Sequence, residues 1–174
     1  MILSTHAIFG AAVASLVPNH PVAGFALGFA SHFALDAIPH RDYDFIFFEG
    51  DYGSEIKPIN ILINKFRLIR DMLLVSFDAF IGLLLAFLLF FDPVHPAIFL
   101  LGVIGALIPD FLVILYIIIR HKSLKFFHDF HTSVIHSKVI LKLNQPTGVL
   151  LQFCTLTVLI AIMYSIKHIY FLIY

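Results

Sequence analysis

Five long apolar runs constrain the fold of this chain more than any other feature. A helix needs roughly 17–25 apolar residues to cross the hydrocarbon core of a bilayer, and each run is close to that length. The runs cover residues 2–17, 22–38, 72–91, 98–119 and 149–166. The sequence therefore predicts an all-α, polytopic membrane protein with about five transmembrane helices, in which residues 1–174 form one helical membrane domain.

The composition agrees with a bilayer environment and excludes several classes of protein. Hydrophobic residues make up 60% of the chain and charged residues 13%, with a mean hydropathy of +0.98, which lies outside the range of soluble domains. The formal net charge is zero, which argues against nucleic acid as a partner. The single cysteine, Cys154, excludes an internal disulfide and a CxxC-type metal site. The oligomeric state is left open.

The basic residues predict an orientation. Ten of the eleven Lys and Arg residues fall in the two connections after the second and fourth apolar runs, so the positive-inside rule places these connections and the N-terminus in the cytoplasm. We expect a location in the bacterial inner membrane. Residues 57–71 and 123–143 mix apolar and basic side chains, which predicts amphipathic segments at the level of the lipid headgroups. The acidic stretch between residues 42 and 55 predicts a loop.

The second apolar run contains ionisable residues at intervals of four, His32, Asp36 and His40. On a helix these three side chains share one face. Ionisable groups at membrane depth are costly without a partner, so such a cluster is a candidate functional site. The alternatives are a hydrogen-bonded polar seam between helices, or simply the end of a helix.

Other ionisable residues are expected at the same depth. His6 lies one turn from the cytoplasmic end of its helix, and Asp110 follows Pro109, which interrupts the fourth run. Imidazole and carboxylate ligands together suit zinc and related metals. We therefore predict a divalent metal site, with zinc as the expected ion, that draws on His6, His32, Asp36, His40, Asp110, His131 and His136. Asp78 or Asp110 is the candidate to orient a catalytic water.

Several of these residues lie in motifs that resemble a known family. The segment 28–36, Gly-Phe-Ala-Ser-His-Phe-Ala-Leu-Asp, is similar to the Ser-His-x-x-x-Asp segment of the YdjM-like family of bacterial inner-membrane proteins, which are described as metal-dependent hydrolases. His6, the Pro109-Asp110 step and the His131-to-His136 spacing are also similar to elements of that family. The first motif also resembles the zinc-dependent phospholipase C and single-strand nuclease superfamily. This resemblance implies a zinc site that hydrolyses phosphate esters.

The motifs occur here in a different order. In the family, the Pro-Asp step and the His-x-x-x-x-His-Ser element come before the Ser-His-x-x-x-Asp helix, whereas here they follow it. Leu112 also stands where the family has a second aspartate.

Three functions remain open from the sequence. The first is a hydrolase that acts on a small-molecule or lipid phosphoester at the membrane surface, with membrane lipid as its partner. The second is a cation or proton transporter, in which intramembrane His and Asp residues form a path that continues toward His20 and His95. The third is a non-catalytic scaffold that binds no metal.

Overall fold

The computed structural model describes residues 1–38, 40, 43, 65–131 and 145–173. Within these ranges the regular elements are all helices and there is no strand, which confirms the predicted all-α class. The helices are α1 (Leu3–Ala14), α2 (Pro21–Asp36), α3 (Lys65–Phe90), α4 (Pro96–Ile119), α5 (Lys122–Asp129) and α6 (Gln145–Ile173).

Three of these helices are long and apolar enough to cross a membrane. The stretches that qualify are Ile69–Phe90 in α3, Pro96–Ile117 in α4 and Pro146–Ile166 in α6, and they indicate a membrane protein. Each of the five apolar runs coincides with a helix, but α1 and α2 have only 12 and 16 residues. Five membrane crossings therefore stay a prediction.

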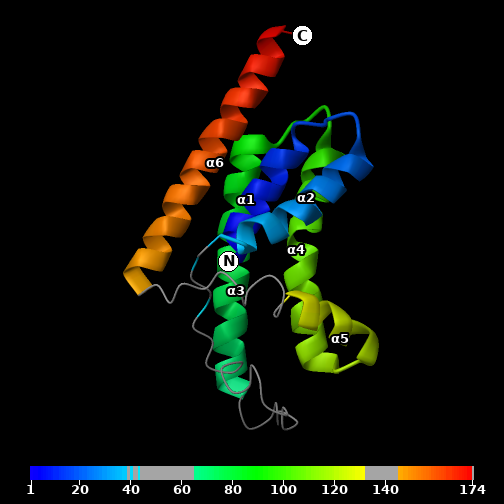
Figure 1. Cartoon of the computed structure of the whole chain (residues 1–174), viewed down its shortest axis with the longest axis vertical. Helices are drawn as coiled ribbons and strands as arrows, with labels where there is room; N and C mark the ends of the chain where they lie inside the picture. Colours follow the sequence, from blue (N-terminus) through cyan, green and yellow to red (C-terminus); the bar gives the residue numbers. More distant parts are fainter. Residues whose placement is uncertain (39, 41–42, 44–64, 132–144, 174) are drawn as a thin grey trace.

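The α1 and α2 helices form a hairpin, in which α1 lies between α3 and α4 (Figure 1). The α1 helix contacts α2, α3, α4 and α6, whereas α2 packs mainly on α4. The α6 helix runs beside this group with most of its surface exposed, and the short α5 helix lies next to the C-terminal part of α4. The N-terminus of α1, the C-terminus of α2 and the middle of α4 consequently meet at one place.

Residues without a large side chain allow these helices to approach closely. A Cβ atom on Gly28 of α2 would overlap the carbonyl oxygen of Gly102 in α4, and one on Gly10 of α1 would overlap Ala106. Association of helices in lipid depends on such close packing, because lipid tails are as apolar as the side chains. Gly102 faces both Gly10 and Gly28, so a single level of α4 sets the spacing of three helices.

Both α2 and α4 begin with a His-Pro step. His20 and His95 are the N-cap residues, and Pro21 and Pro96 open the helices. Proline suits this position because the first backbone N–H groups of a helix have no partner within it. These two turns lie at the end of the helices opposite to the meeting point of α1, α2 and α4.

The structure changes the prediction of two amphipathic segments. Residues 65–71 are the first turns of the continuous helix α3, which begins well before the predicted span, while residues 57–64 lie outside the described residues. The N-terminal part of the segment 123–143 forms α5, and residues 132–143 are not described. The acidic residues predicted to form a loop also fall outside the described ranges, with only Tyr43 described between them.

Candidate metal centre

The last two turns of α2 deliver His32 and Asp36 side by side. The His32 Nε2 atom lies 3.0 Å from Asp36 Oδ2, and both side chains are fully buried. The Nδ1–H group of His32 donates a hydrogen bond of 2.8 Å to the backbone carbonyl of Ala106 in α4. Because Nδ1 is the donor, a neutral His32 directs the lone pair of Nε2 toward the carboxylate.

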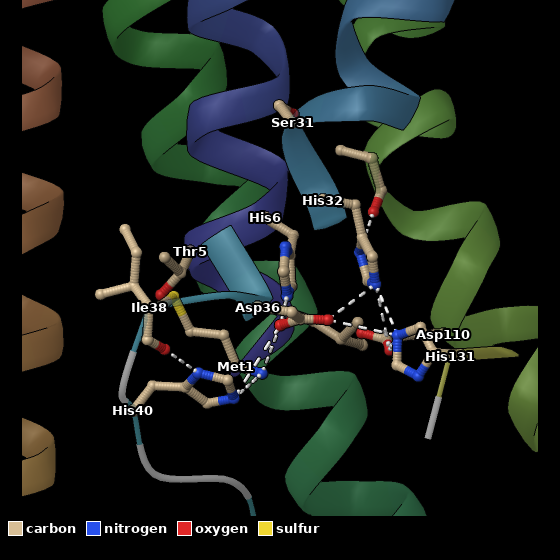
Figure 2. A network of polar contacts seen from close by, with 12 residues as sticks. Met1, Thr5, His6, Ser31, His32, Asp36, Ile38, His40, Asp110 and His131 are labelled. Carbon is tan, nitrogen blue, oxygen red and sulfur yellow. Dashed lines mark hydrogen bonds and ion pairs between the residues drawn. The ribbon is translucent and has the colours of Figure 1, made fainter. Parts of the chain in front are cut away.

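Two further side chains reach the same point from other elements (Figure 2). Asp110 follows Pro109 in the interior of α4, and its Oδ1 atom is 3.6 Å from His32 Nε2. His131 follows α5, and its Nε2 atom is 2.8 Å from His32 Nε2 and 3.2 Å from Asp36 Oδ2. It is also 3.5 Å from Asp110 Oδ1.

The four atoms that could ligate a metal form a compact group. The atoms of His32, Asp36, Asp110 and His131 all lie within 4.8 Å of one another. Ligands at about 2.0–2.1 Å from a tetrahedral zinc ion are roughly 3.3 Å apart, which is close to most of the separations above. The two carboxylates bring negative charge to this place, and the Met1 ammonium group beside Asp36 offsets part of it. A bound metal cation would add to this compensation.

The other oxygen of Asp36 faces a second set of nitrogen atoms. Asp36 Oδ1 accepts a hydrogen bond of 2.8 Å from the Met1 ammonium group, and it lies 3.2 Å from His6 Nε2 and 3.9 Å from His40 Nε2. The Nδ1–H of His40 donates to the Ile38 carbonyl, 2.6 Å away, and its Nε2 is 2.7 Å from the Met1 nitrogen. Both oxygens of Asp36 therefore face nitrogen atoms.

His6 differs from the other histidines in its hydrogen bonding. It is completely buried, and its ring stacks on His32 with centroids 4.1 Å apart. Neither ring nitrogen makes a hydrogen bond within the described part of the chain. A buried polar group without a partner is costly, so His6 is the residue at this place whose polar atoms are least accounted for.

Asp78 lies beside this group and has another set of contacts. Its Oδ2 atom accepts a hydrogen bond of 2.8 Å from the Ser4 N–H, in the first turn of α1, where backbone donors lack partners. The Tyr43 hydroxyl donates to the same oxygen at 2.5 Å and accepts from the Leu3 N–H at 2.8 Å. Burial, followed by the hydrogen bond to Asp78, raises the pKa of Tyr43 well above its usual range, which keeps this hydroxyl a donor. Asp78 and Tyr43 thus hold the start of α1.

The structure brings together most of the residues predicted from the sequence. His32, Asp36, Asp110 and His131 form the compact group, His6 and His40 face the other oxygen of Asp36, and Asp78 caps α1. His136 lies outside the described residues. Sequence reasoning did not include the contacts of Met1 and Tyr43. No spacing pattern marks either of them, because both reach the site through the tertiary fold.

The four side chains of the group differ in their exposure to solvent. The side chains of His32 and Asp36 have no exposed surface and that of His131 has 5%, whereas that of Asp110 is 21% exposed. Access from outside the protein is therefore on the side of Asp110.

Comparison with known proteins gives no relative for this arrangement. Neither the family models nor the curated proteins and solved structures contain a match to this chain. Fold and site together define an all-helical membrane protein with a buried cluster of His and Asp residues.

Proposed function

We propose that this chain is a membrane-embedded, metal-dependent hydrolase that acts on phosphoesters at the membrane surface. The observation that carries the proposal is the convergence of four potential ligand atoms from α2, α4 and the residue after α5. Two imidazoles and two carboxylates are a set that suits zinc. The proposal agrees with the activity implied by the motifs around His32 and His131.

The residues present have contacts that suit a metal ion. His32 and His131 face each other through Nε2 atoms 2.8 Å apart, and two lone pairs at that distance need a proton or a cation between them. The hydrogen bond from His32 to Ala106 is the outer contact that orients metal-ligating histidines in proteins. The buried His6 also has a ring nitrogen near Asp36 that makes no hydrogen bond within the described residues and could accept a metal ion.

The side chains would divide the work as follows. His32, Asp36 and His131 are enclosed and would hold the ion, with His6 and His40 as further candidate ligands on the other side of Asp36. A bound zinc ion would lower the pKa of a water molecule and polarise a phosphoryl oxygen. Asp110 is the partly exposed member of the group, so it would meet the substrate and orient water. Asp78 would act indirectly, by holding the start of α1.

The distribution of ionisable residues favours an enzyme over a conduction path. A path across the membrane would continue from the cluster toward His20 and His95. Between the cluster and these turns, the four helices α1 to α4 contain no Asp, Glu, His, Lys or Arg: none occurs at positions 7–14 of α1, 21–31 of α2, 79–90 of α3 or 96–109 of α4. The candidate site is confined to one end of the bundle, as expected for an enzyme that works at one membrane surface.

Metal content and activity test the proposal together. We would purify wild-type protein with His32→Ala and Asp36→Ala variants, and measure bound zinc by elemental analysis. His95→Ala is the matched control, because this histidine also contacts an aspartate but lies at the opposite turn. We expect near-stoichiometric zinc in wild type and control, and a loss in both site variants. Metal-dependent hydrolysis of a phosphodiester or a phospholipid should follow the same pattern.

Two outcomes would contradict the proposal. Unchanged metal content in both site variants would remove the metal centre. Bound metal without hydrolysis of any phosphoester would remove the enzyme, and ion flux in proteoliposomes would then test transport. Absence of metal from the wild-type protein, even after incubation with zinc, would favour the scaffold.

A further inference from the structure

The short helix α5 has two unlike sides. On its inner side, the Phe127 ring lies 6.4 Å from Phe29 and 6.5 Å from Phe33 of α2, and the His128 ring lies 4.6 Å from Tyr116 of α4. On its outer side, Phe126 is 78% exposed, beside the exposed lysines Lys122 and Lys125. None of the residues of α5 is buried, so the protein itself holds this helix weakly.

The position of α5 matches the level of a membrane surface. The apolar span of α4 ends at Ile117, and α5 begins five residues later, after a turn in which Arg120 adopts a left-handed backbone with φ of 57°. An exposed Phe next to lysines, directly after a membrane span, is the arrangement of helices that lie in the interface between headgroups and acyl chains. Figure 1 shows α5 beside the C-terminal part of α4.

The charges of this segment select the kind of lipid. Residues 119–131 contain three cationic side chains, Arg120, Lys122 and Lys125, and one anionic side chain, Asp129. Lys125 donates a hydrogen bond of 2.6 Å to Asp129, while Arg120 and Lys122 extend the positive charge toward the end of α4. Basic side chains next to a membrane span are attracted to anionic lipids. Charge complementarity therefore points to an anionic phospholipid surface as the partner.

The same helix leads directly into the candidate metal centre. Phe130 follows α5 and packs on Phe33 at 5.7 Å, and His131 is the next residue. Because α5 has few anchors of its own, a contact that holds α5 also holds the Nε2 atom of His131 near His32. Among the candidate ligands, His131 is thus the one whose position depends most on what α5 contacts outside the protein.

We propose that α5 docks on anionic phospholipid headgroups, with Phe126 inserted among the acyl chains, and that this docking positions His131 for metal binding. Only the second part of this proposal, the positioning of His131, rests on the metal centre proposed above. Docking itself is tested without metal. In this arrangement Lys122 and Arg120 contact lipid phosphates, and His131 completes the ligand group when the protein lies in an anionic membrane.

A tryptophan probe tests docking, because the chain contains no Trp. The Phe126→Trp variant would be placed in nanodiscs of phosphatidylcholine alone, or with phosphatidylglycerol at about one part in three. Val94→Trp, at the exposed turn between α3 and α4, is the control. We expect quenching of Trp at position 126 by brominated acyl chains, with slower amide hydrogen exchange in α5 in the anionic lipid. The control should be insensitive to lipid charge.

Charge variants at position 122 separate lipid contact from helix stability. Lys122→Glu places an acid in the first turn of α5, which favours the helix through its dipole, yet it should abolish the protection by anionic lipid. Lys122→Arg should retain it. Zinc affinity of the wild type should rise about tenfold or more in anionic nanodiscs relative to neutral ones. Attraction of zinc to the charged surface accounts for part of this increase and should persist in the Lys122→Glu variant. The remaining increase in zinc affinity should be absent from that variant.

The outcomes distinguish the two proposals. Absence of quenching at position 126, or equal exchange of α5 amides in both lipids, would overturn docking whether or not metal binds. Lipid-dependent docking with equal zinc affinity of wild type and Lys122→Glu in anionic nanodiscs would overturn the positioning of His131. Docking by a protein that binds no zinc in either lipid would refute the metal centre, and with it the positioning role, while leaving the lipid contact established.

Discussion

Two His-Asp pairs lie at opposite ends of the helix bundle and differ in burial and in the number of elements that contact them. His32 and Asp36 lie 3.0 Å apart, fully buried, with contacts from α1, α4 and the residue after α5. His95 and Asp92 lie 2.9 Å apart in the turn before α4, where their side chains are 33% and 39% exposed. Asp92 also accepts a hydrogen bond from the Val94 N–H, which makes the pair a local turn contact. A His-Asp pair indicates a site only where several elements converge on it.

The largest expected effect is on zinc affinity, and it comes from His131, the candidate ligand farthest along the chain from His32 and Asp36. His131→Ala should lower zinc affinity by more than about 100-fold, because loss of an outer-sphere contact alone costs 10–100-fold. His95→Ala, which removes a histidine from the opposite turn, is the control and should bind zinc normally. Titration with a competing chelator measures both. Equal zinc affinity of His131→Ala and the control would mean that zinc binding at His32 and Asp36 does not need His131.

The next effect concerns the packing that buries the inner pair. Gly28→Leu would drive a side chain into the backbone of α4 at Gly102, and overpacking of this kind typically costs about 1–3 kcal/mol. Ala26→Leu, at an exposed position of α2, should change stability by less than about 0.5 kcal/mol. Thermal unfolding in detergent compares the two. Similar stability of both variants would contradict the close contact of α2 with α4.

A smaller effect distinguishes the orientation of His32 from the stability of the protein. Pro109 interrupts the backbone ladder of α4 close to Ala106, whose carbonyl orients His32. Pro109→Ala should restore a regular helix and leave the protein as stable or more so, yet lower zinc affinity about tenfold. Pro96→Ala, at the start of α4, should leave zinc affinity unchanged. A Pro109→Ala variant with normal zinc affinity would show that Pro109 has no part in the site.

The smallest effect is expected at the outer pair. His95→Gln removes a partly exposed contact with Asp92, for which surface pairs suggest about 0–1 kcal/mol, and leaves the turn contact of Asp92 with Val94 in place. Unfolding midpoint and zinc content should both stay close to wild type. A clear loss of zinc in this variant would show that the two ends of the bundle are coupled and would favour the transporter hypothesis.

The sequence alone was sufficient for the helices and for part of the cluster. Apolar runs locate all the long helices, and the spacing of four places His32 next to Asp36 because a helix repeats every 3.6 residues. Their meeting with Asp110 and His131 depends on which helices pack together, and a periodic pattern within one helix carries no such information.

Glycine spacing is the signal that was available for this packing. Gly24 and Gly28 on α2 are four residues apart, as are Gly102 and Ala106 on α4, and small residues at this spacing are typical of close helix contacts in membranes. The contacts of Tyr43 and Asp78 had no comparable signal. Asp78 stands in an apolar run where it resembles a catalytic carboxylate, and only the fold reveals the Ser4 N–H that it satisfies.

The uneven enclosure of the four candidate ligand side chains would have a kinetic consequence if they hold the proposed ion. Only Asp110 has substantial exposed surface, so an ion behind it would leave through a narrow route or after a transient separation of α5 from α2. Its release would then follow the opening rate of the protein, and a higher chelator concentration would not accelerate it. Slow exchange of this kind would let the protein retain its ion through a change of surroundings in which the free metal is scarce.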